Sequence, residues 1–380
     1  MRFLKYLPIL LMLLLHIKGY AQDFLIENIT VFDGENVIQN TSILVKDGEV
    51  SNVTADLKFD GDIIDGSGKF LMPGMTNSHV HAWMAGNLVE AAKAGVLNVL
   101  DMHGVEQYQQ SMRKRFLDST NYARYWFAGA AATVPNGHGT QYGFTTPTLT
   151  EPEEADEFVA DRIKAGAHYL KIIVESLRPS LKPETVEALI KSAHAKNLNA
   201  VVHVSQMENA EQVLSFGADG LVHVWWDKPF EAKKLKALAD RSEFFMVPTL
   251  LTVIRIFENN TSMEDVSRLS KEELLGEVLK AYEAGVPILA GTDPPNARIN
   301  YGSDIYEEMK LLKEAGLSSI DVLKSATSLP AIHFDLPKLG FLKPGYKADM
   351  VLLNENPLED MEHLYTIEAV WKEGKVVKTP

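Results

Sequence analysis

The sequence predicts an α/β protein in which a (β/α)8 TIM-like barrel is joined to a small β-sandwich domain formed by the N- and C-terminal segments. From about residue 73 to residue 337, apolar strand-like runs alternate with helical patterns, as in right-handed βαβ units around a parallel sheet. Both ends of the chain instead show short β-rich runs between turns. A middle segment of roughly 265 residues with about eight such strands fits a closed barrel better than an open sheet.

The N-terminal β-rich segment, residues 22–72, contains the runs FLIENITVFDG, TSILVKDGEV and DIIDGSGKFLM. Period-two runs that end in Asp-Gly are hairpin signals, so we expect antiparallel sheet here. The closing segment, residues 339–380, returns to β-rich sequence in GFLKPGYKADMVLLN and EAVWKEGKVV. We therefore expect the two ends of the chain to pack together beside the barrel.

The barrel segment, residues 73–338, alternates between two periodicities. Its apolar runs predict strands at 96–102, 169–174, 199–204, 221–226, 244–250 and 286–293, with a further strand region at 125–134. Helices are predicted at 153–165, 184–196 and 207–216. The helix at 184–196 follows Pro183 and carries its apolar residues on one face, at Val186, Leu189, Ile190 and Ala193.

The first 21 residues are typical of a secretory signal peptide. Arg2 and Lys5 precede an apolar run from Leu7 to Leu15, and small residues close the segment at Ala21. This run is too short to span a bilayer comfortably, which disfavours the alternative of a retained membrane anchor. Because there is no cysteine, the cleavage point carries no lipidation signal. We expect an exported protein, periplasmic or secreted, that is not lipidated and has no stable membrane insertion after cleavage.

Composition excludes several classes of function. The 380 residues carry a formal net charge of −14, which argues against a nucleic-acid partner, since such binding depends on Lys and Arg contacts to phosphates. The absence of cysteine excludes disulfides, thiolate nucleophiles and iron–sulfur clusters. Any metal must therefore be bound through nitrogen and oxygen. The expected partner is a small-molecule substrate, and a homo-oligomer remains open.

Ligand-type residues stand at the ends of the predicted strands. The segment PGMTNSHVH places His79 and His81 two residues apart, so their side chains point the same way, as two imidazole ligands of one metal require. Buried polar groups are costly unless they are bonded or bind metal, and barrel enzymes keep their sites at the C-terminal ends of strands. Further polar residues in such positions are Lys171, His203, His223 and Asp293.

This pattern resembles the metal signature of the amidohydrolase superfamily, in PGMTNSHVH, Lys171, His203, His223 and the GTD that ends in Asp293. The resemblance extends over nearly the whole mature chain, including the closing KPGYKADMVLLNENPL. It is closest to the imidazolonepropionase-related and prolidase-like branch of metal-dependent hydrolases.

The resemblance implies a binuclear metal centre. His79, His81 and Asp293 would bind one ion, His203 and His223 the other, and Lys171 would bridge both as a carbamate formed with CO2. The expected cofactors are two divalent ions, Zn²⁺ or else Mn²⁺ or Co²⁺, because imidazole and carboxylate ligands discriminate weakly among them. A bridging hydroxide would attack the substrate carbonyl, and Asp293 would transfer the proton.

A glycine-rich segment predicts where substrate binds. Residues 135–143, PNGHGTQYG, follow the third strand region, where a loop of the barrel would face the site. His138 and Tyr142 could hydrogen-bond a substrate carbonyl or oxyanion. A surface turn with incidental polar side chains is the alternative. His103 could support the site, while Trp83, Trp225 and Trp226 could line an apolar pocket or simply pack in the core.

The favoured function is hydrolysis of a C–N amide bond in a dipeptide or an N-acyl amino acid. A lactonase or esterase on the same binuclear site is the first alternative. A mononuclear cyclic amidine deaminase is the second, and Lys171 speaks against it, because the resemblance implies that such deaminases usually lack the bridging lysine. A non-catalytic metal-dependent binding protein is the third, and it would not need Asp293 as a general base.

Overall fold

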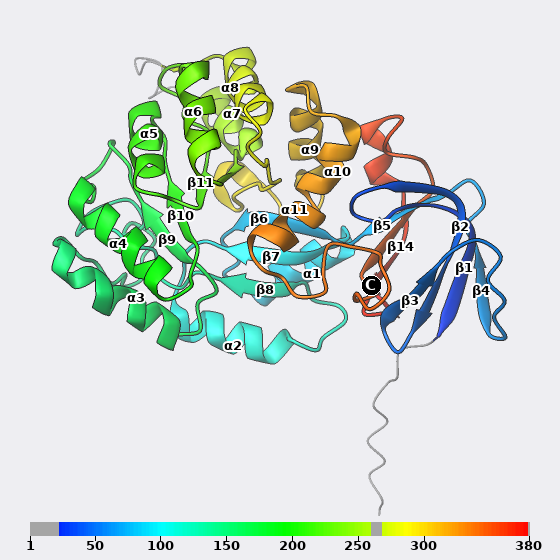
Figure 1. Cartoon of the computed structure of the whole chain (residues 1–380). Coiled ribbons are helices and arrows are strands. Elements are labelled where there is room, and N and C mark those ends of the chain that lie inside the picture. The colour runs from blue at the N-terminus through cyan, green and yellow to red at the C-terminus, as the bar shows by residue number, and fades with distance from the viewer. Residues whose placement is uncertain (1–22, 260–267, 379–380) are drawn as a thin grey trace, which may run out of the picture.

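The computed structural model describes residues 23–259 and 268–378. The predicted signal peptide, residues 1–21, therefore lies outside the described residues. The chain forms a larger α/β part and a smaller β-rich part beside it (Figure 1). Within the described ranges, no helix combines the length and the apolar composition that crossing a bilayer would require.

Parallel strands form the centre of the larger part, in one sheet of three strands and one of four. The first sheet contains β6 (Met75–Val80), β7 (Val96–Asp101) and β8 (Arg124–Phe127), and the second contains β9 (Leu170–Ile173), β10 (Ala200–His203), β11 (Gly220–Val222) and β12 (Phe245–Val247). The predicted alternation of strands and helices is thus confirmed.

Backbone contacts link the two sheets at both ends. Ala132, just after β8, forms a parallel bridge with Ile172 of β9. On the other side Met246 of β12 forms a parallel bridge with Ile288, and the amide of Ser78 in β6 donates to the carbonyl of Ala290 at 2.9 Å. The arrangement is TIM-barrel-like, with helices outside the strands (Figure 1).

Several predicted strands are shorter in the structure. The strand predicted at 221–226 ends at Val222, and the predicted region at 125–134 is strand only as far as Phe127. Residues 286–293 form only the bridge at Ile288, because neighbouring amides bond elsewhere, that of Ala290 to the carbonyl of Ser325 and that of Thr292 to the side chain of Asn77. The strand predicted at 244–250 ends at Val247. Helix α7 starts at Leu250, because the buried carboxylate of Glu308 accepts the amides of Leu250 and Leu251 at 3.0 and 2.8 Å.

The helices of the larger part confirm the three predicted ones as α3, α4 and α5. Their bounds are α1 (Ala85–Lys93), α2 (Glu106–Phe116), α3 (Ala155–Lys164), α4 (Pro183–Ala195), α5 (Met207–Ser215), α6 (Ala232–Arg241), α7 (Leu250–Asn259), α8 (Lys271–Glu283), α9 (Asp304–Glu314), α10 (Ser319–Ser325) and α11 (Ser328–His333). Pro183 is the first residue of α4, and the four apolar residues predicted on one face of this helix are buried.

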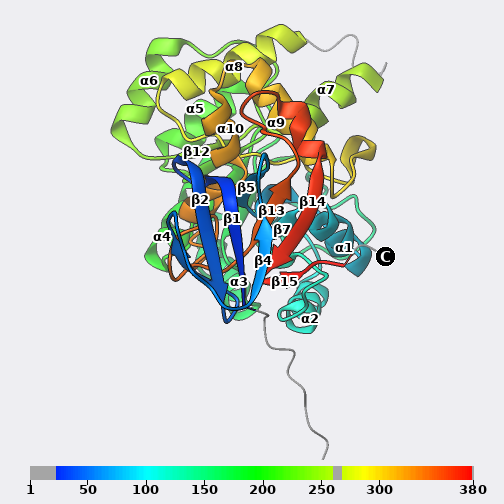
Figure 2. The ribbon, with the colours of Figure 1, turned by 90° about the vertical axis from the view of Figure 1, so that its right-hand side faces the viewer.

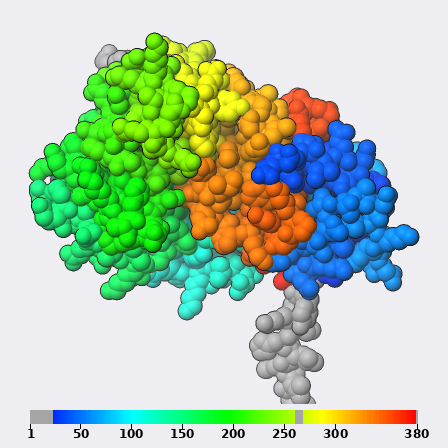
Figure 3. Space-filling model, in the orientation of Figure 1, coloured from blue at the N-terminus to red at the C-terminus, as the bar shows by residue number. Residues whose placement is uncertain are grey.

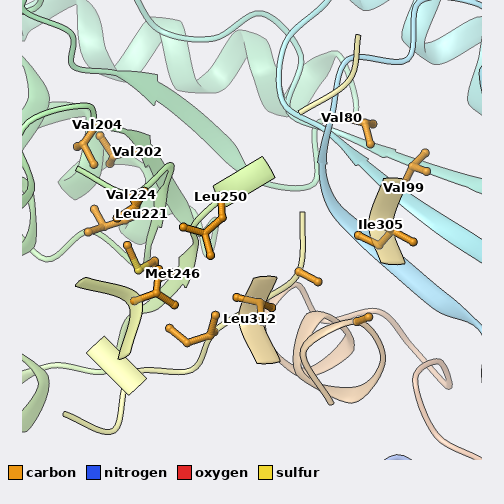
Figure 4. Packing of buried hydrophobic residues seen from close by; sticks show 14 of the residues in the cluster. Val80, Val99, Val202, Val204, Leu221, Val224, Met246, Leu250, Ile305 and Leu312 are labelled. Atoms are coloured by element: carbon orange, nitrogen blue, oxygen red, sulfur yellow. The ribbon is translucent and has the colours of Figure 1, made fainter. Parts of the chain in front are cut away.

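Apolar side chains from strands and helices meet in one large core (Figure 4). Val202, Leu221 and Met246 come from three neighbouring strands, while Ile305 and Leu312 come from one face of α9. Every one of these five side chains is at most 1% exposed. Burial of this kind is the main favourable term in folding, and here it fixes the strands whose ends carry the site.

The smaller part unites both ends of the chain in one sheet, which faces the viewer in Figure 2. Its strands are β1 (Phe24–Phe32), β2 (Val37–Lys46), β3 (Glu49–Val53), β4 (Asp62–Asp65), β5 (Phe70–Pro73), β13 (Met350–Leu353), β14 (Ile367–Lys372) and β15 (Lys375–Val376). A separate apolar cluster joins the two ends, with Ile26 and Val45 from the first and Met350 and Trp371 from the second. Their predicted association is confirmed.

The expectation of antiparallel pairing throughout this part is wrong for two strands. β1, β2 and β3 pair antiparallel, with the β2–β3 turn at Asp47 and Gly48 in the left-handed region, at φ 51° and 82°. β4 and β5, however, run parallel to β1. After β3 the chain crosses to the other side of β1 instead of turning directly back, and so both later strands enter in the direction of β1.

A buried ion-pair group links the two parts, which are in contact in the space-filling view (Figure 3). Arg124 of β8 is 4% exposed. It contacts Asp349, which precedes β13, and bonds the carboxylate of Glu373 at 2.7 Å. The amide of Glu373 also donates to Asp349 at 2.8 Å.

Replacing Arg124 with Met should lower the free energy of unfolding by about 3–5 kcal/mol, because Asp349 would remain buried without its cation. Denaturant titration of both proteins measures this change. Lys69→Met is the matched control, since Lys69 forms a more exposed pair with Glu368 and its loss should cost under about 1 kcal/mol. Equal effects of the two substitutions would contradict the structural role of Arg124.

Candidate metal centre and substrate cavity

Three of the predicted ligands lie together at one end of the parallel strands. His79 lies on β6 and His81 follows this strand, while Asp293 ends the neighbouring segment. Oδ1 of Asp293 is 3.3 Å from Nε2 of His79 and 3.0 Å from Nε2 of His81. All three residues are buried, and their ligand-type atoms lie within 4.8 Å of one another.

The backbone of β6 and the 286–293 segment fixes this group. The amide of Asp293 donates to the carbonyl of His79 at 2.8 Å. Asn77, fully buried, accepts the amides of His79 and Thr292 through one side-chain oxygen. A side chain at Gly291 would come within 2.9 Å of the backbone nitrogen of His79, so this close approach requires glycine.

The other two predicted histidines face each other beside the first group. His203 ends β10 and His223 follows β11, and their ring centroids are 4.5 Å apart. The ring of His223 also lies 4.9 Å from that of His79. The structure thus brings both histidine pairs to one place.

Neighbouring side chains hold one nitrogen of each of these two rings. Nε2 of His203 lies 3.3 Å from a carboxylate oxygen of Glu175, and Nδ1 of His223 lies 2.7 Å from the hydroxyl of Thr249. The opposite nitrogen of each ring is then left for a ligand, which is the arrangement that metal-binding histidines usually show.

Lys171 of β9 is 3% exposed and lines the same cavity. Its amine has no hydrogen-bond partner among the described residues. Burial lowers the pKa of Lys171 to about 7, although the charge of Asp293 opposes the shift. An amine with this pKa is partly neutral near neutral pH, and the neutral form is the one that reacts with CO2.

Unsatisfied buried atoms show that the residues present fit a metal. Nδ1 of His79, Nζ of Lys171 and Oδ1 of Asp293 have no well-oriented hydrogen bond within the described chain. Such groups are costly to bury unless something else binds them. A set of imidazoles and a carboxylate is suited to divalent transition metals.

Burial favours the neutral form of two of these imidazoles. It lowers the pKa of His79 and of His223 well below the usual value, and the neighbouring positive groups lower it further. For His81 burial acts in the same direction, but the carboxylate of Asp293 outweighs it and raises the pKa. Neutral imidazoles are the form that binds metal.

Strained backbone marks the same place. His223 has φ 71°, Asp293 has φ 57° and Thr249 has φ 47°. For residues other than glycine this left-handed region is uncommon, and such strain gathers at functional sites. The predicted ligands His223 and Asp293, and Thr249 which bonds His223, thus adopt backbone conformations that depend on the surrounding contacts.

A cavity of about 250 Å³ opens over these residues. The ligand-type residues form its polar part, and its apolar wall includes Ile173, Leu177, Trp226, Val253, Ile256 and Phe257. Of the three tryptophans singled out in the sequence, Trp226 lines this cavity. Trp225 is buried and donates to the carboxylate of Glu277 instead, while Trp83 contacts Tyr142 ring to ring at 5.4 Å.

His138 and Tyr142 line the cavity as predicted. The ring of His138 lies 4.8 Å from that of His203. Burial lowers the pKa of His138 to about 3, and the charge of His203 adds to this shift. Burial also raises the pKa of Tyr142 to about 12. Both side chains are therefore neutral near pH 7 and able to donate hydrogen bonds.

Close packing holds the loop that carries these donors. His103 accepts the amide of Ala131 through Nδ1 at 2.9 Å and contacts the carbonyl of Gly139 through Nε2 at 3.0 Å. A side chain at Gly137 would meet the hydroxyl of Thr133 at 2.5 Å. His103 thus supports the loop, and the glycine is needed for close approach.

Sequence analysis missed Glu175, Ser205, Thr249 and Asn77. A signal existed for two of them. Ser205 lies two residues after His203, and Glu175 lies four residues after Lys171, so strand alternation places each on the face of its predicted ligand. The structure brings Glu175 and Ser205 into hydrogen-bond contact. Thr249 and Asn77 gave no comparable signal.

The fold and this cluster of ligand-type residues are those of a metal-dependent hydrolase. Comparison with known protein families supports the same class. The model of the amidohydrolase family matches residues 70–378. The chain therefore belongs to the amidohydrolase family, as predicted, and is a hydrolase that acts on carbon–nitrogen bonds.

Among individual proteins, the chain is similar to ochratoxinase from Aspergillus niger, with 25% identity over 378 residues, covering 82% of this chain and 76% of the relative. It is 22% identical over 380 residues to imidazolonepropionase from Thermoplasma acidophilum, covering 88% and 87%. Among solved structures, a putative prolidase from Bifidobacterium longum has a TM-score of 0.81 at 24% identity, covering 95% and 96%. A Xaa-Pro dipeptidase with bound methionine has a TM-score of 0.81 at 21% identity, covering 94% and 100%.

Proposed function

We propose that this protein hydrolyses a C–N amide bond in a dipeptide or an N-acyl amino acid, using two divalent metal ions. The observation that carries the proposal is Lys171, a buried amine that has no partner in the described chain and lines the same cavity as the two histidine pairs. As a carbamate, its oxygens would contact both ions. His79, His81 and Asp293 would hold one ion, and His203 and His223 the other.

When bound, such ions polarise a carbonyl and lower the pKa of water. The protein's own groups complete the reaction. Asp293 would accept a proton from the attacking water and deliver it to the leaving nitrogen. His138 and Tyr142, both neutral, would donate hydrogen bonds to the oxygen of the scissile carbonyl as negative charge develops there. The products are a carboxylic acid and an amine.

The relatives support amide cleavage. Solved structures of similar fold include a prolidase complexed with N-methylphosphonate-L-proline, at 19% identity and a TM-score of 0.77, and A. niger ochratoxinase. Deaminases also occur among the relatives, such as the 5-methylthioadenosine/S-adenosylhomocysteine deaminase of Carboxydothermus hydrogenoformans at 23% identity. Lys171 favours the amidase over a mononuclear deaminase, because a single ion needs no bridging ligand.

A panel of dipeptides, N-acyl amino acids, lactones and cyclic amidines, offered to the metal-loaded protein, tests the proposal. Release of an amine from an N-acyl amino acid or dipeptide, with two metal ions per chain, is the expected result. Lactone or ester cleavage without amide cleavage would replace it with the first alternative. Ammonia release with one ion per chain would indicate a deaminase, and stable binding without turnover a binding protein.

The division of the chain belongs to the same proposal. A signal peptide of residues 1–21 would direct the protein to the periplasm or the medium. Residues 73–338 would close as an eight-stranded barrel around the metals, and residues 22–72 with 339–380 would form a β-sandwich domain. N-terminal sequencing of the exported protein tests the first of these assignments, because cleavage would leave Gln22 at the N-terminus.

A further inference from the structure

One cationic side chain at the cavity has no role in the metal centre. Apart from Lys171, Arg178 is the only lysine or arginine among the residues that line the cavity in the described chain. It lies on the connection between β9 and α4 and is exposed. Within residues 23–259 and 268–378, Arg178 forms no ion pair. Its guanidinium is therefore free to bind an anion.

The connection that carries Arg178 is fixed to the metal centre. One carboxylate oxygen of Glu175 contacts His203 and Ser205, and the other accepts the amide of Leu177 at 3.0 Å. The amide of Glu175 donates to the hydroxyl of Ser180 at 3.1 Å. Both carboxylate oxygens of Glu175, three residues before Arg178, are thus engaged by other groups, and Glu175 forms no ion pair with Arg178.

Contacts with a second loop hold the same connection over the cavity. The carbonyl of Pro179 lies 3.0 Å from the position that a side chain at Gly137 would occupy. Tyr142, on that second loop, has its pKa raised by burial and by Asp293, while the positive charge of Arg178 opposes both effects. The guanidinium therefore lies within electrostatic reach of the proposed oxyanion donor.

Apolar residues lie next to Arg178. Leu177 is 57% exposed, although a leucine is normally buried, and it lines the cavity. Trp226, Ile256 and Phe257 extend this apolar wall. A ligand that fits here combines an anionic group with an apolar group. Its size is limited by the cavity volume of about 250 Å³.

We propose that Arg178 binds a free carboxylate of the substrate, and that the apolar wall binds the side chain next to it. The substrate class would then be N-acyl amino acids or dipeptides with an apolar C-terminal residue. A planar guanidinium can hold a carboxylate through two hydrogen bonds. This inference rests on the proposed function for the reaction, but the carboxylate contact is a binding property that can be measured without turnover.

The test compares two ligands that differ only at the carboxylate, N-acetyl-leucine and N-acetyl-leucinamide. Their dissociation constants are measured by calorimetry on the metal-loaded wild-type protein and on Arg178→Met. The wild type should bind the acid about 10–100-fold more tightly than the amide, because a charge-assisted hydrogen bond contributes about 1.5–3 kcal/mol. Arg178→Met should lose this preference while its affinity for the amide stays the same.

Two further variants separate binding from structural effects. Arg178→Lys keeps the charge without the planar fork and should restore part of the preference. Lys182→Met removes an exposed cation near the start of α4 that pairs with Glu151 and does not line the cavity, so it should change nothing. Equal weakening of acid and amide in Arg178→Met, or no preference for the acid in the wild type, would overturn the proposal.

Calorimetry gives the dissociation constants where neither compound is hydrolysed, and steady-state kinetics replaces it where one of them is. Where the wild type is an amidase, Arg178→Met should raise KM for the acid with kcat nearly unchanged, because the carboxylate contact is the same in ground and transition states. An acid preference that depends on Arg178, without hydrolysis of any amide, would support the carboxylate site and refute the proposed reaction.

Discussion

Changing Asp293 to Asn should lower kcat by about 10²–10⁴-fold, the range expected when a general base is removed. The substitution keeps the size of the side chain but removes both its charge and its ability to accept a proton. The carboxylate now lies 3.0 and 3.3 Å from the imidazoles of His81 and His79. Binding of metal at this pair should weaken as well, because a neutral amide is a poorer ligand than a carboxylate.

The fold should tolerate this substitution. The backbone amide of Asp293 donates to the carbonyl of His79, and that bond does not involve the side chain. Its φ of 57° lies in the left-handed region, where asparagine is among the best-tolerated residues. The denaturation midpoint and the circular dichroism spectrum should therefore match those of the wild type.

Steady-state kinetics on the best amide substrate, together with metal analysis, measures the effect. Asp240→Asn on α6 is a matched control, because Asp240 is exposed and pairs with Lys236 on the same helix. Full activity of Asp293→Asn would refute the assignment of Asp293 as proton acceptor. Lost activity together with lost folding would be uninformative about the base, and the unchanged denaturation midpoint is therefore part of the prediction.

The order of elements could be predicted from sequence because it depends on local periodicity. Helix α4 shows this well. Its proline at the first position and its apolar face are both apparent within 13 consecutive residues, and that face is buried in the structure. The ends of strands were harder to predict, because they depend on contacts with residues far away in the sequence. Glu308 caps α7 from 58 residues away, and no local pattern near Leu250 indicates this.

The candidate ligands could be located because each is a polar residue at the end of an apolar run. The same reasoning failed for groups that support the ligands. Thr249 bonds His223 across 26 residues, and Asn77 joins β6 to Thr292 across 215. Such contacts depend on how strands lie side by side, and a single sequence does not show this.

The role of Arg178 illustrates the same limit. An arginine in a polar connection gives no signal, since most such residues are solvated. Two structural observations single out Arg178. It lines the cavity, and the carboxylate of Glu175 bonds His203, Ser205 and Leu177 instead of Arg178. The residue proposed to select the substrate thus lies in a connection between elements, where sequence periodicity gives no signal.

Changing Lys171 to Ala should abolish activity and reduce bound metal below two ions per chain. The lysine comes from β9 and is 3% exposed, and its amine has no partner among the described residues. As an ammonium ion it could not bind a cation. Its lowered pKa, about 7 as a result of burial, makes carbamate formation with CO2 accessible near neutral pH, and the proposed carbamate would supply negative charge to the two ions.

Elemental analysis of the purified, metal-loaded proteins measures the stoichiometry. Lys182→Ala is the control, since Lys182 is exposed and pairs with Glu151. ¹³C-bicarbonate labelling supplies a second readout, with a carbamate carbon signal expected in the wild type and absent from Lys171→Ala. A Lys171→Ala protein that still holds two ions per chain would refute the bridge, and so would a wild type without the carbamate signal.

Adding a short carboxylic acid to Lys171→Ala distinguishes two roles of Lys171, that of a metal-bridging ligand and that of a packing residue. Truncation to alanine leaves a space beside the histidine pairs that acetate could enter with its carboxylate toward the ions. Partial recovery of metal binding and activity in Lys171→Ala with added acetate, and not with acetamide of the same shape, is the expected result. If Lys171→Ala lost activity only through lower stability, acetate and acetamide should have the same effect, because filling a space in the core does not require a charge. The dependence on a carboxylate therefore tests directly whether the lysine acts through negative charge at this position.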